Sequence, residues 1–192
     1  MKFDTFIFDL DGTLVEFNLD FDEIRKVLNI REKYVLESLM RLDEETRNKK
    51  MQKLKELEIE AAKRAKPIPF AEYILIKLDE NGYKKGIVTR NCRESLDVVL
   101  SRFDFKLDFF ITREDAEPKP SPAPVLLAIK KAKSSPERSI LIGDYKFDLM
   151  SGKSAGIKTV LLLTEKNREN AGEFMHMADY IIESLDEIEK FI

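Results

Sequence analysis

The segment FDTFIFDLDGTLV, residues 3–15, decides how the rest of the chain is interpreted. Its run TFIF, residues 5–8, has the length and the β-branched and aromatic composition of a buried strand. The run is followed by Asp9 and Asp11, which flank a single leucine. Two carboxylates this close repel each other, which costs stability unless a positive charge lies between them. An ordinary turn would explain Asp11 and Gly12 alone, but it does not explain Asp9.

The length and composition indicate a folded protein with one good-sized domain, or a core with a smaller insertion. The 192 residues are 43% hydrophobic, which is enough to build a core and makes wholesale disorder unexpected. The net charge is −3, and the charges are intermixed, without the basic stripe that a nucleic-acid surface requires. We therefore expect no nucleic-acid partner.

The cysteine count and the absence of long apolar runs bear on the cellular location. Cys92 is the only cysteine, so no internal disulfide can form and a reducing compartment is expected. The N-terminus lacks a basic segment followed by a long apolar run, so we expect no signal peptide. No apolar run approaches the roughly 20 residues that cross a bilayer. The sequence thus predicts a cytoplasmic protein without a membrane partner.

Short β-branched or aromatic runs alternate with amphipathic helical patterns along much of the chain. Strands are expected at residues 5–8, 85–88, 109–111, 140–142, 159–163 and 180–182. Helices are expected between several of these runs, at residues 93–103, 122–131 and 147–155. This alternation predicts an α/β fold, with a Rossmann-like parallel sheet covered by helices on both faces.

The region between the first two strands breaks this alternation. Residues 20–78 contain helix formers and charges but no strand pattern, and Leu54, Leu57, Ala61 and Ala65 recur as one buried helix face does. Two prolines then interrupt the pattern, and a further helix is expected at residues 71–78, ended by the pair Asn81-Gly82.

We expect residues 17–80 to form a small all-helical cap domain inserted after the first strand, with residues 1–16 and 81–192 forming the α/β catalytic core. The alternative is that these helices simply pack on the sheet. The insertion is favoured because about sixty residues separate the first two strands, far more than an ordinary crossover needs.

Polar side chains follow three of the predicted strands. Open parallel sheets bind ligands beyond the carboxyl ends of their strands, so these side chains are expected to meet at one edge. They are Asp9 and Asp11 after the first strand, Thr89 and Arg90 after the second, and Asp144 and Asp148 after the run ILIG. Such an oxygen-rich pocket suits a hard divalent cation, and Mg²⁺ prefers a few carboxylates together with water and phosphate oxygens.

Four short motifs stand at these positions, in the order DLDGT (residues 9–13), Thr89, KPSP with Lys119, and GDYKFD (residues 143–148). Together they resemble the four motifs of the haloacid dehalogenase superfamily, in that family's order. Any one of them alone is a weak signal, but four in order are a strong one. The helical insertion lies where the cap domain of the phosphoglycolate phosphatase and β-phosphoglucomutase branch is inserted.

The resemblance implies a Mg²⁺-dependent phosphatase that hydrolyses a small phosphorylated metabolite, such as a phosphoglycolate-like phosphomonoester. Asp9 would be the nucleophile and would form an aspartyl-phosphate. Asp11 would protonate the leaving oxygen and then take a proton from the hydrolytic water. The dehalogenase branch of the superfamily lacks an acid at this position, so Asp11 favours phosphoryl transfer.

The resemblance also implies the ligands of the metal and of the phosphate. Mg²⁺ would be held by the side chains of Asp9 and Asp144 and the backbone carbonyl of Asp11, with support from Asp148, although Asp148 could also be a solvated helix residue. Thr89 and Lys119 would hold phosphoryl oxygens. Arg90 could contact the phosphate or the substrate, and a salt-bridged loop residue is an equal alternative.

Other functions remain open on the same motifs. A phosphomutase or phosphotransferase of the β-phosphoglucomutase type would pass the phosphate from Asp9 to a sugar instead of water. A non-catalytic protein could use the fold for binding, although neither the nucleophile nor the metal aspartates are missing. The oligomeric state and the side chains that select the substrate cannot be derived from the motifs.

Two residues near the motifs have a structural interpretation. Cys92 lies where a helix N-terminus could lower its pKa, but the family needs no thiol, so we interpret it as a small packing residue. Gly152 is unfavourable inside the predicted helix at residues 147–155, by up to about 1 kcal/mol relative to alanine. Close packing against a neighbouring element would explain it.

Overall fold

The computed structural model describes residues 3–16 and 19–192. Within these residues the strands form one six-stranded parallel sheet in the order β3-β2-β1-β4-β5-β6. The strands are β1 (Thr5–Phe8), β2 (Lys84–Val88), β3 (Phe109–Ile111), β4 (Ser139–Gly143), β5 (Lys158–Leu162) and β6 (Tyr180–Ile182). Every predicted strand is present, and each end lies within one residue of its predicted position, so the parallel α/β fold is confirmed.

The helices account for most of the remaining described chain. The α-helices are α1 (Phe21–Leu28), α2 (Val35–Leu39), α3 (Glu44–Lys63), α4 (Ala71–Glu80), α5 (Arg93–Arg102), α6 (Ala123–Ala132), α7 (Lys146–Ser154) and α8 (Arg168–Ala171). Three short 3₁₀ helices are η1 (Pro136–Arg138), η2 (Met175–Met177) and η3 (Leu185–Phe191). The helices predicted at residues 93–103, 122–131 and 147–155 correspond to α5, α6 and α7, with ends within one residue.

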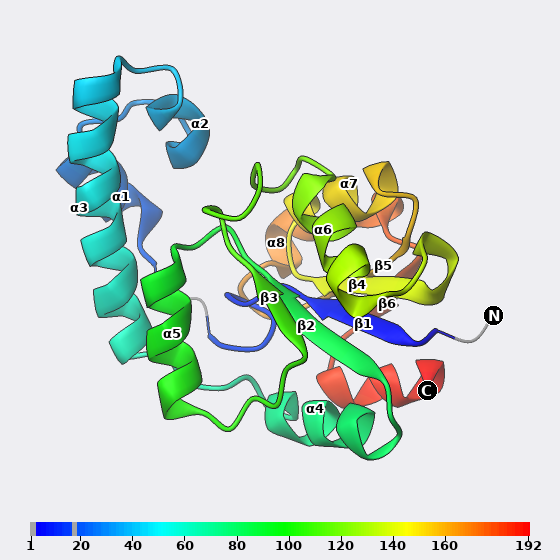
Figure 1. Cartoon of the computed structure of the whole chain (residues 1–192). Coiled ribbons are helices and arrows are strands. Elements are labelled where there is room, and N and C mark those ends of the chain that lie inside the picture. The colour runs from blue at the N-terminus through cyan, green and yellow to red at the C-terminus, as the bar shows by residue number, and fades with distance from the viewer. Residues whose placement is uncertain (1–2, 17–18) are drawn as a thin grey trace.

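The sheet is the middle of three layers, because successive side chains of a strand point to opposite faces. Phe6 and Phe8 of β1 contribute to an apolar cluster with α4, α5 and η3. Ile7, between them, belongs to a second cluster with α6 and with Ala155, which directly follows α7. Figure 1 shows these two helical layers on either side of the strands. The alternation in β1 therefore builds both halves of the core.

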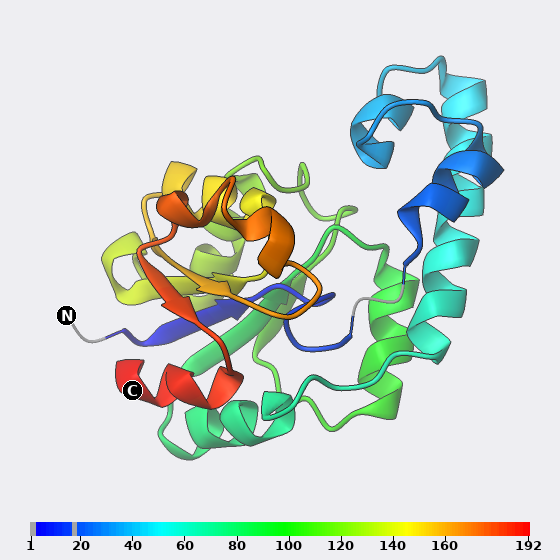
Figure 2. The same ribbon diagram turned by 180° about the vertical axis from the view of Figure 1, so that it is seen from behind.

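Residues 19–63, with α1, α2 and α3, form a helical module with an apolar cluster of its own. The buried members of this cluster are Ile24, Leu28, Ile30, Val35, Leu36, Leu39 and Leu54. Figures 1 and 2 show α1, α2 and the N-terminal part of α3 standing away from the sheet. The C-terminal part of α3 runs alongside α5, and the two helices are in contact. This long helix thus joins the module to the sheet core.

Helix α4 packs on the sheet core and not with the helical module, whereas the sequence predicts that residues 17–80 form one domain. Its side chains Ile74, Leu75 and Leu78 are fully buried, and they pack with the residues of β1 and β2 in the main core. A ten-residue helix with one wide apolar face packs on a sheet when a sheet face is available to cover. Residues 71–80 are therefore part of the α/β core, and the helical module ends before them.

The chain enters and leaves the module at one place. The backbone N–H of Glu16 donates to the carbonyl of Lys66 (2.8 Å), and the N–H of Ile68 donates to the carbonyl of Leu14 (2.9 Å). The two connecting segments are thus paired side by side, so the return lies near residue 66 and not near Asn81, where the sequence places it. Whether the module is a separate cap domain stays a prediction.

Candidate active site

The candidate site lies at the carboxyl ends of the three central strands. In the sheet order β1 is the neighbour of both β2 and β4, and its Phe8 is in register with Ile87 and Ile142. Asp9, Thr89 and Asp144 follow β1, β2 and β4, so this register brings them to one edge of the sheet. A cavity of about 350 Å³ opens there. It is lined by all seven predicted site residues, Asp9, Asp11, Thr89, Arg90, Lys119, Asp144 and Asp148.

Lys119 supplies the positive charge between the carboxylates. Its ammonium group donates to Asp9 Oδ1 (2.6 Å), to Asp148 Oδ1 (2.6 Å) and to the carbonyl of Val88 (2.7 Å). These contacts use all three of its protons. Burial by itself would lower the pKa of Lys119, but the attraction of Asp148 and Asp9 outweighs it and raises the pKa. Lys119 is therefore a buried cation that is held in place, and an ordinary surface position is excluded.

Three carboxylates form the cluster that could hold a metal ion. Ligand oxygens of Asp9, Asp144 and Asp148 all lie within 4.8 Å of one another. Burial raises the pKa of Asp9 to about 6, with Lys119 opposing the rise and Asp148 adding to it. Burial and the charges of Asp9 and Asp148 raise the pKa of Asp144 well above its ordinary value. Lys119 alone does not balance this negative charge, so the residues present fit a hard divalent cation.

Two glycines make room for these carboxylates. A Cβ atom on Gly12 would lie 2.2 Å from Asp144 Oδ2, and Gly12 also has a φ of +87°, which favours glycine. A Cβ atom on Gly143 would lie 2.3 Å from Asp148 Cγ. Any side chain at either position would displace an acidic group from the cluster.

Asp148 and Asp144 are each fixed by a neighbouring backbone or side-chain group. Asp148 is 2% exposed, which excludes the alternative of a solvated helix residue, and its Oδ2 accepts the N–H of Tyr145 (3.1 Å) at the start of α7. The side chain of Asn167 donates to the carbonyls of Asp144 (2.8 Å) and Leu162 (2.9 Å). Asn167 was not predicted as a site residue, because it lies outside the motifs.

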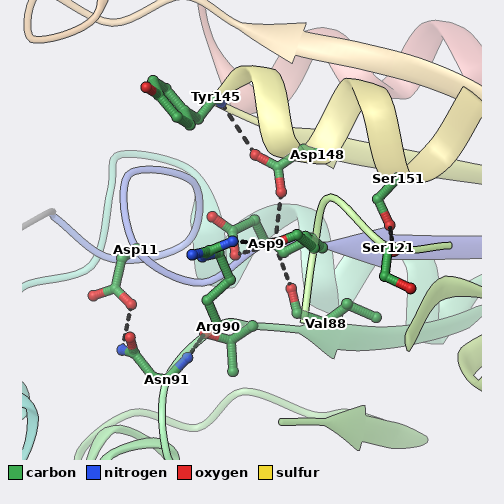
Figure 3. Close-up of polar contacts among 11 residues, drawn as sticks. Asp9, Asp11, Val88, Arg90, Asn91, Ser121, Tyr145, Asp148 and Ser151 are labelled. Atoms are coloured by element: carbon green, nitrogen blue, oxygen red, sulfur yellow. Dashed lines mark hydrogen bonds and ion pairs between the residues drawn. The ribbon is translucent and has the colours of Figure 1, made fainter. Parts of the chain in front are cut away.

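Asp11 lies in an environment that keeps its carboxyl group protonated. Burial, then the charges of Asp9 and Glu58, raise the pKa of Asp11 to about 8. The side chain of Asn91 donates to Asp11 Oδ2 (2.6 Å) and partly opposes this rise. Figure 3 shows this pair beside Asp9. Asn91 belongs to the polar run that follows the second predicted strand, but the sequence alone assigned it no role in the site.

Glu58 reaches the site from helix α3. It is 4% exposed, and its carboxylate binds the Arg113 guanidinium (2.5 Å) and accepts the N–H of Cys92 (3.1 Å). The sequence analysis missed it, although a charged residue four positions after Leu54 and three before Ala61 lies on the buried face of this helix. Burial and Glu58 together raise the pKa of Cys92 to about 12, so the packing role predicted for this thiol fits its surroundings.

Arg90 is engaged with three groups from different parts of the chain. Its guanidinium binds both carboxylate oxygens of Glu37 in α2, at 2.8 and 3.0 Å. It also donates to the carbonyl of Lys119 and lies over the ring of Phe147, 4.6 Å from the ring centre. The contact with phosphate predicted for Arg90 would have to compete with these partners, and it stays a prediction.

The sequence model of the haloacid dehalogenase-like hydrolases matches residues 15–162. The chain belongs to this family. An uncharacterized hydrolase of Saccharomyces cerevisiae is 32% identical over an alignment of 194 positions, which covers 97% of this chain and 89% of the yeast protein. Pyrophosphatase PpaX of Oceanobacillus iheyensis is 27% identical over an alignment of 207 positions, which covers 98% of this chain and 96% of that protein. Both are hydrolases by name, and this chain is a hydrolase of the same family.

Solved structures of haloacid dehalogenase proteins share the fold. A hydrolase from Pseudomonas syringae has a TM-score of 0.81 at 23% identity, over 97% of this chain and 96% of that chain. A predicted phosphoglycolate phosphatase from Haemophilus somnus has a TM-score of 0.73 at 20% identity, over 99% and 98% of the two chains. At these identities the similarity shows the fold alone. Within the described residues, none of the helices has the length and apolar character that crossing a membrane requires.

Proposed function

We propose that this hydrolase is a Mg²⁺-dependent phosphatase that acts on a small phosphorylated metabolite through an aspartyl-phosphate on Asp9. The observation that carries the proposal is that two neighbouring carboxyl groups have different partners, the Lys119 ammonium for Asp9 and the Asn91 amide for Asp11. Asp9 is bound by the Lys119 ammonium, which favours its ionised form, whereas Asp11 has a pKa of about 8. Two carboxyl groups whose surroundings separate their pKa values are suited to act as nucleophile and acid.

The first half of the proposed reaction uses both carboxyl groups. A carboxylate oxygen of Asp9 attacks phosphorus while the bond from phosphorus to the leaving oxygen breaks. The protonated Asp11 gives its proton to that leaving oxygen, which departs as an alcohol. Lys119, within 2.6 Å of Asp9, stabilises the negative charge on the phosphoryl group.

The second half releases phosphate. Asp11, now ionised, takes a proton from a water molecule, whose oxygen attacks phosphorus and breaks the bond to Asp9. Mg²⁺, when bound, supplies positive charge that draws the phosphoryl oxygens to the site and offsets their charge. The carboxylates of Asp9, Asp144 and Asp148 would hold it, together with the carbonyl of Asp11.

The experiment that tests this proposal measures phosphate release from a panel of phosphomonoesters with Mg²⁺, beside the Asp9→Asn protein. We expect the amide to abolish release, because it cannot act as the nucleophile, while circular dichroism and thermal unfolding show an intact fold. Substantial residual activity of Asp9→Asn with unchanged Mg²⁺ affinity would exclude the covalent route.

The proposed location is the cytoplasm, and the proposed partner is the substrate alone. The free thiol of Cys92 is compatible with a reducing compartment. Fractionation of cells that express the tagged full-length chain tests the location.

A further inference from the structure

The cavity is larger than a phosphate site. At about 350 Å³ it falls within the range of roughly 300–1,000 Å³ that holds drug-sized ligands, and the helical module forms the wall opposite the catalytic edge. Most of that wall is apolar, although Arg25, Lys33 and Glu58 also belong to it. Its apolar and aromatic lining residues are Leu19, Phe21, Tyr34, Val35, Leu36 and Leu54. A leaving group that fills this space must bury apolar surface to gain binding free energy.

Aromatic side chains of the module and of the core meet at this cavity. The ring centres of Tyr34 and Phe147 are 5.1 Å apart with an angle of 57° between the rings. Tyr145 lies edge-on to Phe147 (5.2 Å) and contacts Phe174 (5.5 Å). All four rings line the cavity; Phe174 is buried, and the other three are only partly buried. Partly exposed rings in a cavity favour a planar ring in the ligand, which can pack face-to-face or edge-to-face with them.

The charge of Arg90 is already balanced within the protein. Glu37 binds it through both carboxylate oxygens, so an anionic leaving group would have to displace Glu37 to reach the guanidinium. Glu58 also lines the cavity, and its carboxylate is already ion-paired with Arg113. A carboxylate or a second phosphate beside the scissile bond is therefore disfavoured, because it must displace Glu37 from Arg90.

Three further cationic side chains of the described residues line the cavity, namely Arg25 and Lys33 in the helical module and Lys166 in the core. Arg25 is ion-paired with Asp22, and the ammonium of Lys33 lies over the ring of Tyr34, 5.9 Å from its centre. Lys166 also has a partner within the protein. None of the three therefore replaces Arg90 as a site for an anion next to the phosphate.

From these observations, and resting on the proposed phosphatase function, we infer that the substrate is a phosphomonoester whose leaving group is uncharged beside the phosphate and carries an aromatic ring. Glu37 is the specificity-determining residue, because it holds Arg90 and so rejects leaving groups with a second anion. Tyr34 and Phe147 are the residues that contact the ring.

The first test compares kcat/KM for alkyl phosphates that have similar intrinsic reactivity. The aromatic set is 2-phenylethyl phosphate, a nucleoside 5′-monophosphate and riboflavin 5′-phosphate, which separates a simple ring from a base and a flavin. The anionic alkyl phosphate is phosphoglycolate, and pyrophosphate is added as an anionic phosphoanhydride, whose better leaving group favours it. We expect the best aromatic ester to exceed both anionic compounds by at least about tenfold, which is about 1.4 kcal/mol. Tyr34→Leu and Phe147→Leu should raise KM for the aromatic ester more than KM for phosphoglycolate.

The second test replaces the carboxylate of Glu37 with an amide. Glu37→Gln keeps the size of the side chain but removes its charge, so Arg90 becomes available to an anion. We expect kcat/KM for phosphoglycolate to rise about tenfold, while that for 2-phenylethyl phosphate changes less than about twofold. The matched control is Glu45→Gln, which removes an exposed ion pair with Lys49 in the same module, outside the cavity lining, and should change neither substrate.

The outcomes separate this inference from the proposed function. Phosphoglycolate or pyrophosphate as the better wild-type substrate overturns the inference but leaves the phosphatase function standing, and so does an unchanged preference in Glu37→Gln. If no ester is hydrolysed, the proposed function fails, and calorimetric binding of the same esters to Asp9→Asn with Mg²⁺ still tests the cavity. Binding of phosphoglycolate at least as tight as that of 2-phenylethyl phosphate would then overturn the inference.

Discussion

Asp11 shares its surroundings with Asp9, Glu58 and the amide of Asn91. Burial is the largest cause of the raised pKa of Asp11, about 8; the charges of Asp9 and Glu58 add to the rise, and the hydrogen bond from Asn91 opposes it. This pKa therefore depends on three separate segments, namely the loop after β1, helix α3 and the loop after β2. This is the property that the proposed proton transfers require.

We expect Asp11→Asn to reduce kcat by about 10²–10⁴-fold, the usual contribution of a general acid and base. The amide cannot give a proton to the leaving oxygen or take one from water, so both steps slow. If the second step is slowed more, the aspartyl-phosphate accumulates, and mass spectrometry of acid-quenched enzyme detects it. Unchanged turnover of an alkyl phosphate would contradict the role of Asp11.

Because α4 packs in the sheet core, the stability of a chain without its helical module depends on whether the deletion includes α4. The connecting segments are paired through Glu16 and Lys66, so a short glycine–serine linker can join these two residues and remove residues 17–65. A cut of residues 17–80 also removes Ile74, Leu75 and Leu78, which are fully buried. These three side chains contribute about 6 kcal/mol by apolar burial, similar to the whole free energy of unfolding of many domains.

We expect the protein without residues 17–65 to fold, but to be less stable than the full chain because Arg113 loses its partner Glu58. The protein without residues 17–80 should fail to fold and should aggregate. Cooperative thermal unfolding measured by circular dichroism distinguishes them. The shorter variant should hydrolyse an activated aryl phosphate but lose its preference among metabolites. If both deletions unfold alike, α4 does not belong to the core.

Helix α7 packs against β5 at Gly152, in agreement with the close contact proposed for this glycine. A Cβ atom there would lie 2.5 Å from Thr159 Cγ2 and 3.2 Å from Leu141 Cδ2. Thr159 cannot turn away easily, because its hydroxyl group donates to Asp179 Oδ2 (3.1 Å). The helix carries Asp148 at its start, so its distance from the sheet also sets the place of that carboxylate.

We expect Gly152→Ala to lower the free energy of unfolding by about 1–2 kcal/mol, because the cost of overpacking exceeds the gain of about 1 kcal/mol in helix propensity. The melting temperature should fall by about 2–8 °C. Gly172→Ala is the matched control, because nothing lies within 4 Å of a Cβ atom at that position. It should leave the melting temperature within about 1 °C, and an equal loss in both variants would exclude the α7–β5 contact as the cause.

The site gathers enough negative charge to affect the stability of the whole molecule. In the unfolded chain these aspartates have a pKa near 3.8, whereas in the folded protein Asp9 titrates at about 6 and Asp11 at about 8. The folded state therefore binds more protons than the unfolded state between these values, and stability falls as the pH rises through them. The Asp9 side chain is 14% exposed, so water in the cavity limits the effect.

We expect the melting temperature measured in chelator to be lower at pH 8.5 than at pH 5.5. Mg²⁺ should raise the melting temperature more at pH 8.5 than at pH 5.5, because fewer protons compete for the carboxylates at the higher pH. Asp11→Asn should show a flatter pH dependence in chelator, because its side chain does not titrate. Differential scanning calorimetry at both pH values, with and without Mg²⁺, checks this. A melting temperature that rises with pH in chelator would contradict the raised pKa values.

The strands and the residues that follow them were predictable from short stretches of sequence. A buried strand is recognised from a few neighbouring side chains, and parallel strands bring their carboxyl ends to the same edge whatever the rest of the chain does. Asp9, Thr89 and Asp144 could therefore be assigned to one site before any contact was known. The motifs added Lys119, which is 110 residues from Asp9 in sequence.

The partners of these residues depended on how distant segments pack. Helix α4 has the same local pattern whether it covers the sheet or joins the module, and only the apolar face available to it decides between them. Glu37 and Arg90 are 53 residues apart, and Glu58 reaches Arg113 over 55 residues. Periodicity and propensity describe neighbours along the chain, whereas charge pairing and burial depend on what the folded chain brings within a few ångströms.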